Sequence, residues 1–86
     1  MEKEINMKYW VYVLRDDKGK FYKGMTNNLE RRLKEHKNKH TITTARMGNI
    51  SLAYQEEFDS FNEARKRELY FKSSAGRRFL KNKLGS

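Results

Sequence analysis

The chain has 86 residues, lacks cysteine and proline, and carries 20 Lys and Arg against 11 Asp and Glu, a net charge of +9. This length predicts one domain over residues 1–86, with its core at about 8–84, and the lack of cysteine excludes disulfides, thiolate metal sites and a Cys nucleophile. No apolar run approaches the roughly 18–20 residues of a membrane span, so we expect a soluble, cytoplasmic protein. We interpret the excess of basic residues as a surface that binds nucleic acid, in preference to a charge that only keeps the protein soluble or a surface that binds an anionic membrane. Membrane binding is disfavoured because no basic amphipathic helix has an exposed apolar face.

The first elements are predicted to form a β-hairpin. Residues Lys8–Leu14 are β-branched and aromatic and apolar on both faces, as in a central strand. A turn follows at Asp16–Lys20, with Gly19 placed for a positive φ. Residues Phe21–Met25 then predict a short second strand.

A helix of about three turns is predicted next, over Asn28–Asn38. Asn27 and Glu30, three residues apart, form the expected N-terminal capping pair. The polar segment Lys39–Asn49 is expected to be a loop.

The second half of the chain predicts one more strand and two helices. Residues Ile50–Phe58 predict the strand, because apolar side chains recur at every second position: Ile50, Leu52 and Tyr54. Ser60 and Glu63 form a capping box for a helix that runs to about Lys72. A short basic helix, Gly76–Lys83, follows. The expected order is ββαβαα.

One face of the first helix combines Leu29, Arg32, Leu33 and His36, at positions i, i+3, i+4 and i+7. The leucines explain why this face is buried. A structural interpretation of the other two is a snorkelling Arg and a partly buried His. The functional interpretation is a phosphate clamp beside a proton carrier, and the spacing alone leaves both open.

The second helix has a carboxylate, Glu68, inside an apolar stripe made of Phe61, Ala64 and Leu69, with Phe71 close by. Burying a lone carboxylate costs free energy unless a cation holds it. Lys72 at i+4 or Arg65 at i−3 can supply that cation, and a divalent metal is the alternative. Tyr12 and Tyr22 add a third feature, because their hydroxyls converge near Arg32 and His36 if both rings face the helices.

These residues together resemble the GIY-YIG nuclease superfamily, most of all its small stand-alone bacterial members, related to the nuclease domain of the excinuclease C subunit that acts in DNA repair. The matching motifs are Trp10-Val11-Tyr12, Tyr22-Lys23-Gly24, Leu29-x-x-Arg32-Leu33-x-x-His36, Ala64-x-x-x-Glu68-x-x-x-Lys72 and the tail Lys72–Lys81. The chain departs from the family pattern at Trp10, which replaces Gly, and at Lys23, which replaces Ile. The usual proline before the third strand is also absent.

The resemblance implies an α+β domain, a three-stranded antiparallel sheet flanked by helices, with its site on the concave side of the sheet. It implies metal-dependent hydrolysis of phosphodiester bonds, with DNA favoured over RNA as the substrate and one Mg²⁺ or Mn²⁺ ion held by Glu68. Arg32 would meet the charge of the transition state. The residues expected to contact nucleic acid are Lys23, Lys39, Arg46, Lys72, Arg77 and Arg78. No membrane and no obligate protein partner is expected.

The resemblance assigns deprotonation of water to Tyr12, with Tyr22 and His36 in support. A tyrosine pKa of about 10 would have to fall by about 3 for work near pH 7, so His36 is the competing base. A rival function is a non-catalytic, basic nucleic-acid-binding module, which gains nothing from a carboxylate that faces its polyanion. An inactive family member is a third alternative, disfavoured because all five expected polar positions are filled.

Overall fold

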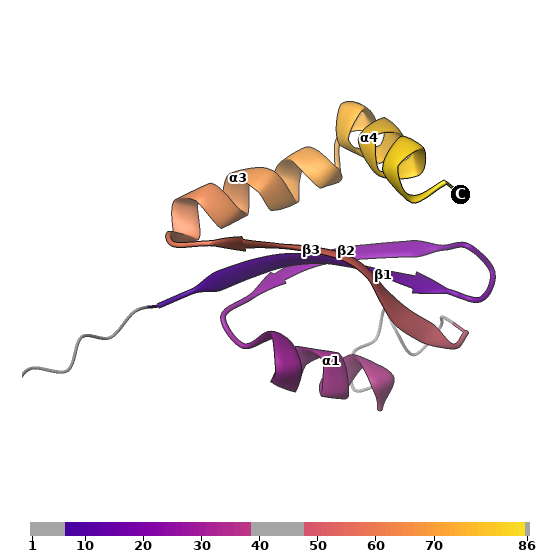
Figure 1. Cartoon of the computed structure of the whole chain (residues 1–86), viewed down its shortest axis with the longest axis horizontal. Helices are drawn as coiled ribbons and strands as arrows, with labels where there is room; N and C mark the ends of the chain where they lie inside the picture. Colours follow the sequence, from indigo (N-terminus) through magenta and orange to yellow (C-terminus); the bar gives the residue numbers. More distant parts are fainter. Residues whose placement is uncertain (1–6, 39–47, 86) are drawn as a thin grey trace, which may run out of the picture.

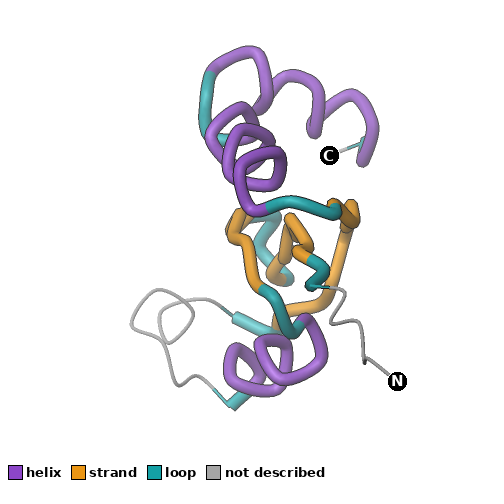
Figure 2. Tube along the Cα trace, turned by 90° about the vertical axis from the view of Figure 1, so that its left-hand side faces the viewer, coloured by secondary structure: helices purple, strands orange, loops and turns teal. Residues whose placement is uncertain are grey.

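The structure is a computed structural model that describes residues 7–38 and 48–85. Its elements follow the predicted order: β1 (Tyr9–Asp16), β2 (Phe21–Thr26), α1 (Leu29–Lys37), β3 (Ile50–Phe58), α3 (Phe61–Phe71) and α4 (Ser74–Leu84). The strands form one antiparallel sheet in the order β2-β1-β3. Helix α1 covers one face of the sheet, and α3 and α4 lie on the opposite face (Figures 1 and 2). The predicted α+β architecture is confirmed.

The central strand β1 divides its side chains between the two faces. Val11 and Val13 are fully buried against α3 and α4, in a cluster with Ala64, Phe71 and Leu80. Because neighbouring side chains of a strand point to opposite faces, Tyr12 faces α1 instead. The apolar core therefore lies on one side of the sheet and a mixed aromatic and polar layer on the other.

The hairpin turn is held by the carboxylate of Asp16, the last residue of β1. This carboxylate accepts hydrogen bonds from the backbone N–H groups of Lys18 (2.9 Å), Lys20 (2.7 Å) and Gly48 (3.3 Å). Burial alone would raise the pKa of Asp16, but these three donors lower it below its ordinary value. Gly19 has the predicted positive φ, 84°. Of the predicted loop 39–49, only residues 48 and 49 lie within the described part of the chain.

The N-cap of α1 was predicted one residue too early. Asn28, and not Asn27, accepts a hydrogen bond from the backbone N–H of Arg31 at 3.1 Å. The backbone N–H of Asn28 donates in turn to the hydroxyl of Thr26 at 3.1 Å. The end of β2 therefore selects which of two adjacent asparagines caps the helix.

Strand β3 has the predicted bounds but contains a register shift that the alternation did not reveal. Leu52 pairs with Leu14 and Tyr54 pairs with Val13, so Ala53 is an extra residue. Ile50 and Leu52 consequently share the α1 face, whereas Tyr54 faces α3 and α4. The prediction that these three apolar residues form one regular alternation is wrong, because one inserted residue reverses the faces.

The buried stripe of α3 is narrower than predicted. Ala64, Glu68 and Phe71 are buried, at helical spacings of four and three residues. Phe61 and Leu69 are half exposed, at 52% and 50%. Phe61 packs edge-on against Tyr9 at a ring separation of 5.8 Å, at the end of the sheet.

The contact between the sheet and the last two helices is organised by Arg67. Its guanidinium forms a two-pronged ion pair with Glu56, at 2.8 and 3.1 Å. The same group lies over the rings of Tyr70, Phe71 and Phe79, at 4.7–5.0 Å from their centroids. One cation thereby connects β3, α3 and α4.

Helix α4 begins at Ser74, two residues before its predicted start, because Ser73 caps it by accepting from the backbone N–H of Gly76 at 3.2 Å. In the part of the chain that the structure describes, no helix is long and apolar enough to cross a membrane.

Gly76 is required where α4 approaches α3. A Cβ at this position would collide with the backbone carbonyl of Tyr70. We expect Gly76→Ala to lower the free energy of unfolding by about 1–3 kcal/mol, as other overpacked sites do. Denaturant titration measures the loss. The control is Asn82→Ala on the exposed side of α4, expected to change stability by less than about 0.5 kcal/mol.

Candidate active site

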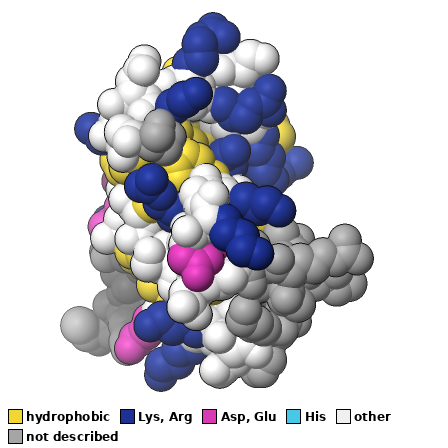
Figure 3. All heavy atoms as spheres, turned by 90° about the vertical axis from the view of Figure 1, so that its right-hand side faces the viewer, with side chains coloured by type: hydrophobic (Ala, Val, Ile, Leu, Met, Phe, Trp, Pro, Cys, Tyr) yellow, Lys and Arg dark blue, Asp and Glu magenta, His cyan; other side chains and the backbone are white. Residues whose placement is uncertain are grey.

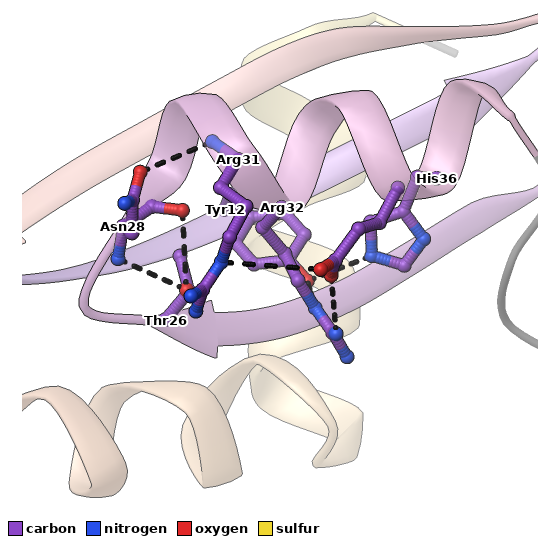
Figure 4. A network of polar contacts seen from close by, with 7 residues as sticks. Tyr12, Thr26, Asn28, Arg31, Arg32 and His36 are labelled. Carbon is purple, nitrogen blue, oxygen red and sulfur yellow. Dashed lines mark hydrogen bonds and ion pairs between the residues drawn. The ribbon is translucent and has the colours of Figure 1, made fainter.

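Tyr12 lies at the centre of a buried polar cluster between β1 and α1. Its hydroxyl contacts His36 Nε2 at 2.9 Å and receives a long hydrogen bond from Arg32 Nε at 3.4 Å. The three side chains point toward one another from the two elements (Figure 4). Arg32 can only donate, so the Tyr12 hydroxyl oxygen accepts from it, while the tautomer of His36 sets which partner donates in the hydrogen bond between Tyr12 and His36.

Tyr22 completes an aromatic cluster around this hydrogen bond. Its ring centroid lies 4.9 Å from that of His36 and 6.3 Å from that of Tyr12. Tyr22 is half-buried, whereas Tyr12 and His36 are both 0% exposed. The cluster therefore has one side chain that reaches the surface and two beneath it.

Gly24 makes room for the Tyr12 ring. The two residues are paired across β1 and β2. A Cβ on Gly24 would lie 2.6 Å from the Tyr12 hydroxyl oxygen. Any side chain at position 24 would displace that oxygen from His36 and Arg32.

Helix α1 presents Arg32 and His36 one turn apart on one face. Asn28 fixes the start of the helix and therefore the rotation of this face toward β1. Glu35 accepts from Arg32 Nη1 at 2.9 Å, which orients the guanidinium. Both side chains contact the Tyr12 hydroxyl, and His36 is fully buried where the structural interpretation expected a partly buried His.

The environment keeps the two titratable groups of the cluster neutral. Burial raises the pKa of Tyr12 to about 12, although its hydrogen bond with Arg32 acts in the opposite direction. Tyr22 raises the pKa of Tyr12 further. Burial, and next the charge of Arg32, lower the pKa of His36 below its ordinary value of 6.5. Near pH 7 Tyr12 therefore keeps its proton and His36 is neutral.

Glu68 comes from the opposite side of the sheet. It lies on α3, which covers the other face of the sheet from α1 (Figure 1). Its Oε1 pairs with Arg65 Nη1 at 2.9 Å and its Oε2 with Lys72 Nζ at 3.2 Å. Arg65 and Lys72, the two cations considered from the sequence as alternatives to a metal ion, therefore both pair with Glu68.

A metal site built from protein groups alone is absent from residues 7–38 and 48–85, where no three His, Asp or Glu side chains lie together. Mg²⁺ commonly binds through one or two carboxylates and completes its shell with water and substrate phosphate. The buried carboxylate of Glu68 fits that role by its chemistry, provided that Arg65 and Lys72 release it.

Three of the predicted phosphate-binding cations, Lys23, Lys72 and Arg77, lie close together, and Lys72 pairs with Glu68. Lys23 is half-buried on the face of β2 opposite to Tyr22, and its pKa is lowered by burial and by the charges of Arg77 and Lys72. Arg77 donates to the backbone carbonyl of Lys72 at 3.2 Å. Arg78 and Arg77 line a shallow hollow on α4 with Ser74 and Lys81. Lys and Arg side chains gather over the α4 end of the molecule (Figure 3).

Two of the predicted cations, Lys39 and Arg46, lie outside the described residues. The sequence did not identify Gly24 and Glu35 as parts of the site. Glu35 lies three residues after Arg32, a helical spacing that permits the ion pair between them. The role of Gly24 depends on strand register, which the sequence does not specify locally.

Comparison with known proteins identifies the family. The family model of the GIY-YIG catalytic domain matches residues 8–82. A UPF0213 protein from the VLF1-GP41 intergenic region of Autographa californica nuclear polyhedrosis virus is 40% identical over 76 residues, 84% of this chain and 72% of its own. A UPF0213 protein of Limosilactobacillus reuteri is 37% identical over 73 residues, 81% of this chain and 76% of its own. The solution NMR structure of a UPF0213 protein from Bacillus halodurans matches with a TM-score of 0.55 and 31% identity, over 86% of this chain and 82% of that one. The chain belongs to the GIY-YIG catalytic-domain family, which is a family of nucleases.

Proposed function

We propose that this protein is a divalent-metal-dependent endonuclease that hydrolyses phosphodiester bonds in DNA. The observation that carries the proposal is the Tyr12 hydroxyl, held between the guanidinium of Arg32 and the imidazole of His36. A permanent cation next to side chains that can carry a proton suits a reaction in which water loses a proton and a phosphate gains charge.

Protons would move inward from the surface, with His36 as the final acceptor. Tyr12 is too deeply buried to meet water, so the half-buried Tyr22 is the contact with the attacking water molecule. Water gives a proton to Tyr22, Tyr22 gives its own to Tyr12, and Tyr12 gives its own to His36 Nε2. The resulting hydroxide forms a bond to phosphorus as the bond to the leaving 3′ oxygen breaks.

Arg32 would stabilise the charge that the phosphate gains. Its hydrogen bond with Tyr12 raises the pKa of an already basic group, so Arg32 stays protonated throughout. Glu35 keeps the guanidinium in place before substrate binds. A divalent ion held by Glu68 would supply Lewis-acid stabilisation of the leaving oxygen.

The basic residues around α4 would hold the nucleic-acid backbone. Lys23, Lys72, Arg77 and Arg78 come from β2, α3 and α4, so they would contact more than one phosphate. The rival function, a non-catalytic binding module, needs these cations but has no use for a buried Tyr–His pair.

The first test separates transition-state stabilisation from binding. We expect Arg32→Ala to lower the cleavage rate by roughly 10²–10³ while DNA affinity changes only a few-fold. Plasmid nicking and fluorescence anisotropy measure the two quantities. Arg31→Ala removes the same charge from the exposed side of α1 and should leave the rate nearly unchanged. If affinity and rate fell together for Arg32→Ala, Arg32 would be an ordinary phosphate contact.

The second test concerns the carboxylate. Glu68→Gln should abolish cleavage at every Mg²⁺ or Mn²⁺ concentration, whereas Glu63→Gln, on the exposed side of α3, should cleave normally. The loss of two ion pairs with half-exposed cations should cost at most about 2 kcal/mol of stability, about 1 for each pair, so thermal melting will show a folded protein. Normal nicking by Glu68→Gln would favour the binding module.

The third test is the pH dependence of cleavage. His36 accepts a proton only when neutral, and its pKa is lowered, so kcat/KM should rise with pH through a step below 6.5 and then level off. If the Tyr12 phenolate were the base, its pKa of about 12 would make the rate climb tenfold per pH unit through the alkaline range. A pH–rate profile of the wild-type protein distinguishes these cases.

A further inference from the structure

The carboxylate of Glu68 is not directly accessible to a metal ion. The Glu68 side chain is 11% exposed, and each of its oxygens is occupied by a different cation. Arg65 and Lys72 are about half exposed, at 51% and 49%, so both can swing into solvent without breaking the core. A divalent ion that binds Glu68 must displace at least one of them.

The surroundings of Lys72 favour the arrival of a second anion. Arg77 Nη1 donates to the backbone carbonyl of Lys72 at 3.2 Å, and the pKa of Lys23 is lowered by burial and then by the charges of Arg77 and Lys72, so these three cations lie close enough to repel. Glu68 is therefore paired with two cations, Arg65 and Lys72, and two further cations lie beside Lys72. A phosphate group would relieve this excess of positive charge, and Lys72 is the cation common to both interactions.

We propose that Arg65 and Lys72 close Glu68 to divalent ions in the free protein, and that a nucleic-acid phosphate opens it by drawing these cations away. Metal ion and nucleic acid then bind cooperatively, each raising the affinity for the other by the same factor. This inference rests on the proposed metal-dependent function and specifies how the same site is regulated. The free protein would be protected from binding a metal ion without its substrate.

The test measures Mn²⁺ binding without reference to cleavage. Electron paramagnetic resonance reports free Mn²⁺ in solutions of the whole protein, with and without a short phosphorothioate DNA duplex. Binding to the duplex itself is subtracted by using Glu68→Gln as the reference. We expect the duplex to tighten Mn²⁺ binding to the wild-type protein about tenfold, within the usual range for coupled sites. Anisotropy of the labelled duplex should show an equal gain on adding Mn²⁺.

A variant pair assigns the effect to the ion pair. Lys72→Met should tighten Mn²⁺ binding about tenfold in the absence of duplex and should respond less when duplex is added. Lys66→Met removes the same charge from the exposed side of α3 and should behave as the wild-type protein does. Because the wild-type measurement requires no substitution, a failure of Lys72→Met to fold would leave the proposal testable.

Two results would overturn the inference. One is equal Mn²⁺ affinity of the wild-type protein with and without duplex, and the other is equal affinity of Lys72→Met and Lys66→Met. If Glu68→Gln still abolished cleavage, the proposed function would survive either result. If Mn²⁺ bound Glu68→Gln as well as the wild-type protein under all conditions, the inference and the metal-dependent function would both fail.

Discussion

The alternation of side chains along β1 is the constraint on which the rest of the molecule depends. Val11 and Val13 point toward α3 and α4 and form the apolar core, while Tyr12, between them, points toward α1. The packing that makes the fold stable and the polar cluster that can do chemistry are consequently built on the same few residues. A chain of this size has few buried positions, so a single strand serves both layers.

The two faces also divide the charges. On the α1 face, burial keeps Tyr12 and His36 neutral, the charge of Arg32 further lowers the pKa of His36, and the hydrogen-bonding capacity of the Tyr12 hydroxyl is used within the cluster. On the other face, Glu68 neutralises part of a cationic surface that would otherwise repel itself. The first arrangement suits proton transfer. The second suits the exchange of one ion for another.

The sequence was sufficient for features that depend on local spacing and insufficient for those that depend on tertiary contact. Element order, the capping by Ser60 and the shared face of Arg32 and His36 follow from short-range chemistry. The bulge at Ala53 depends on strand pairing, which no local pattern encodes. The exposure of Phe61 depends on how α3 is rotated over the sheet. For Glu68, the sequence offered Arg65 and Lys72 as alternatives, and the fold uses both.

Gly24 packs so closely against Tyr12 that the Tyr12 ring fills the space a side chain at position 24 would need. A larger residue at position 24 can be accommodated only if a smaller residue replaces Tyr12. The hydroxyl between Arg32 and His36 is then lost. Because Gly24 has no side chain, the Tyr12 hydroxyl can lie between Arg32 and His36. Substitutions at these two positions should therefore be tolerated only together, so we expect positions 12 and 24 to covary among homologous sequences.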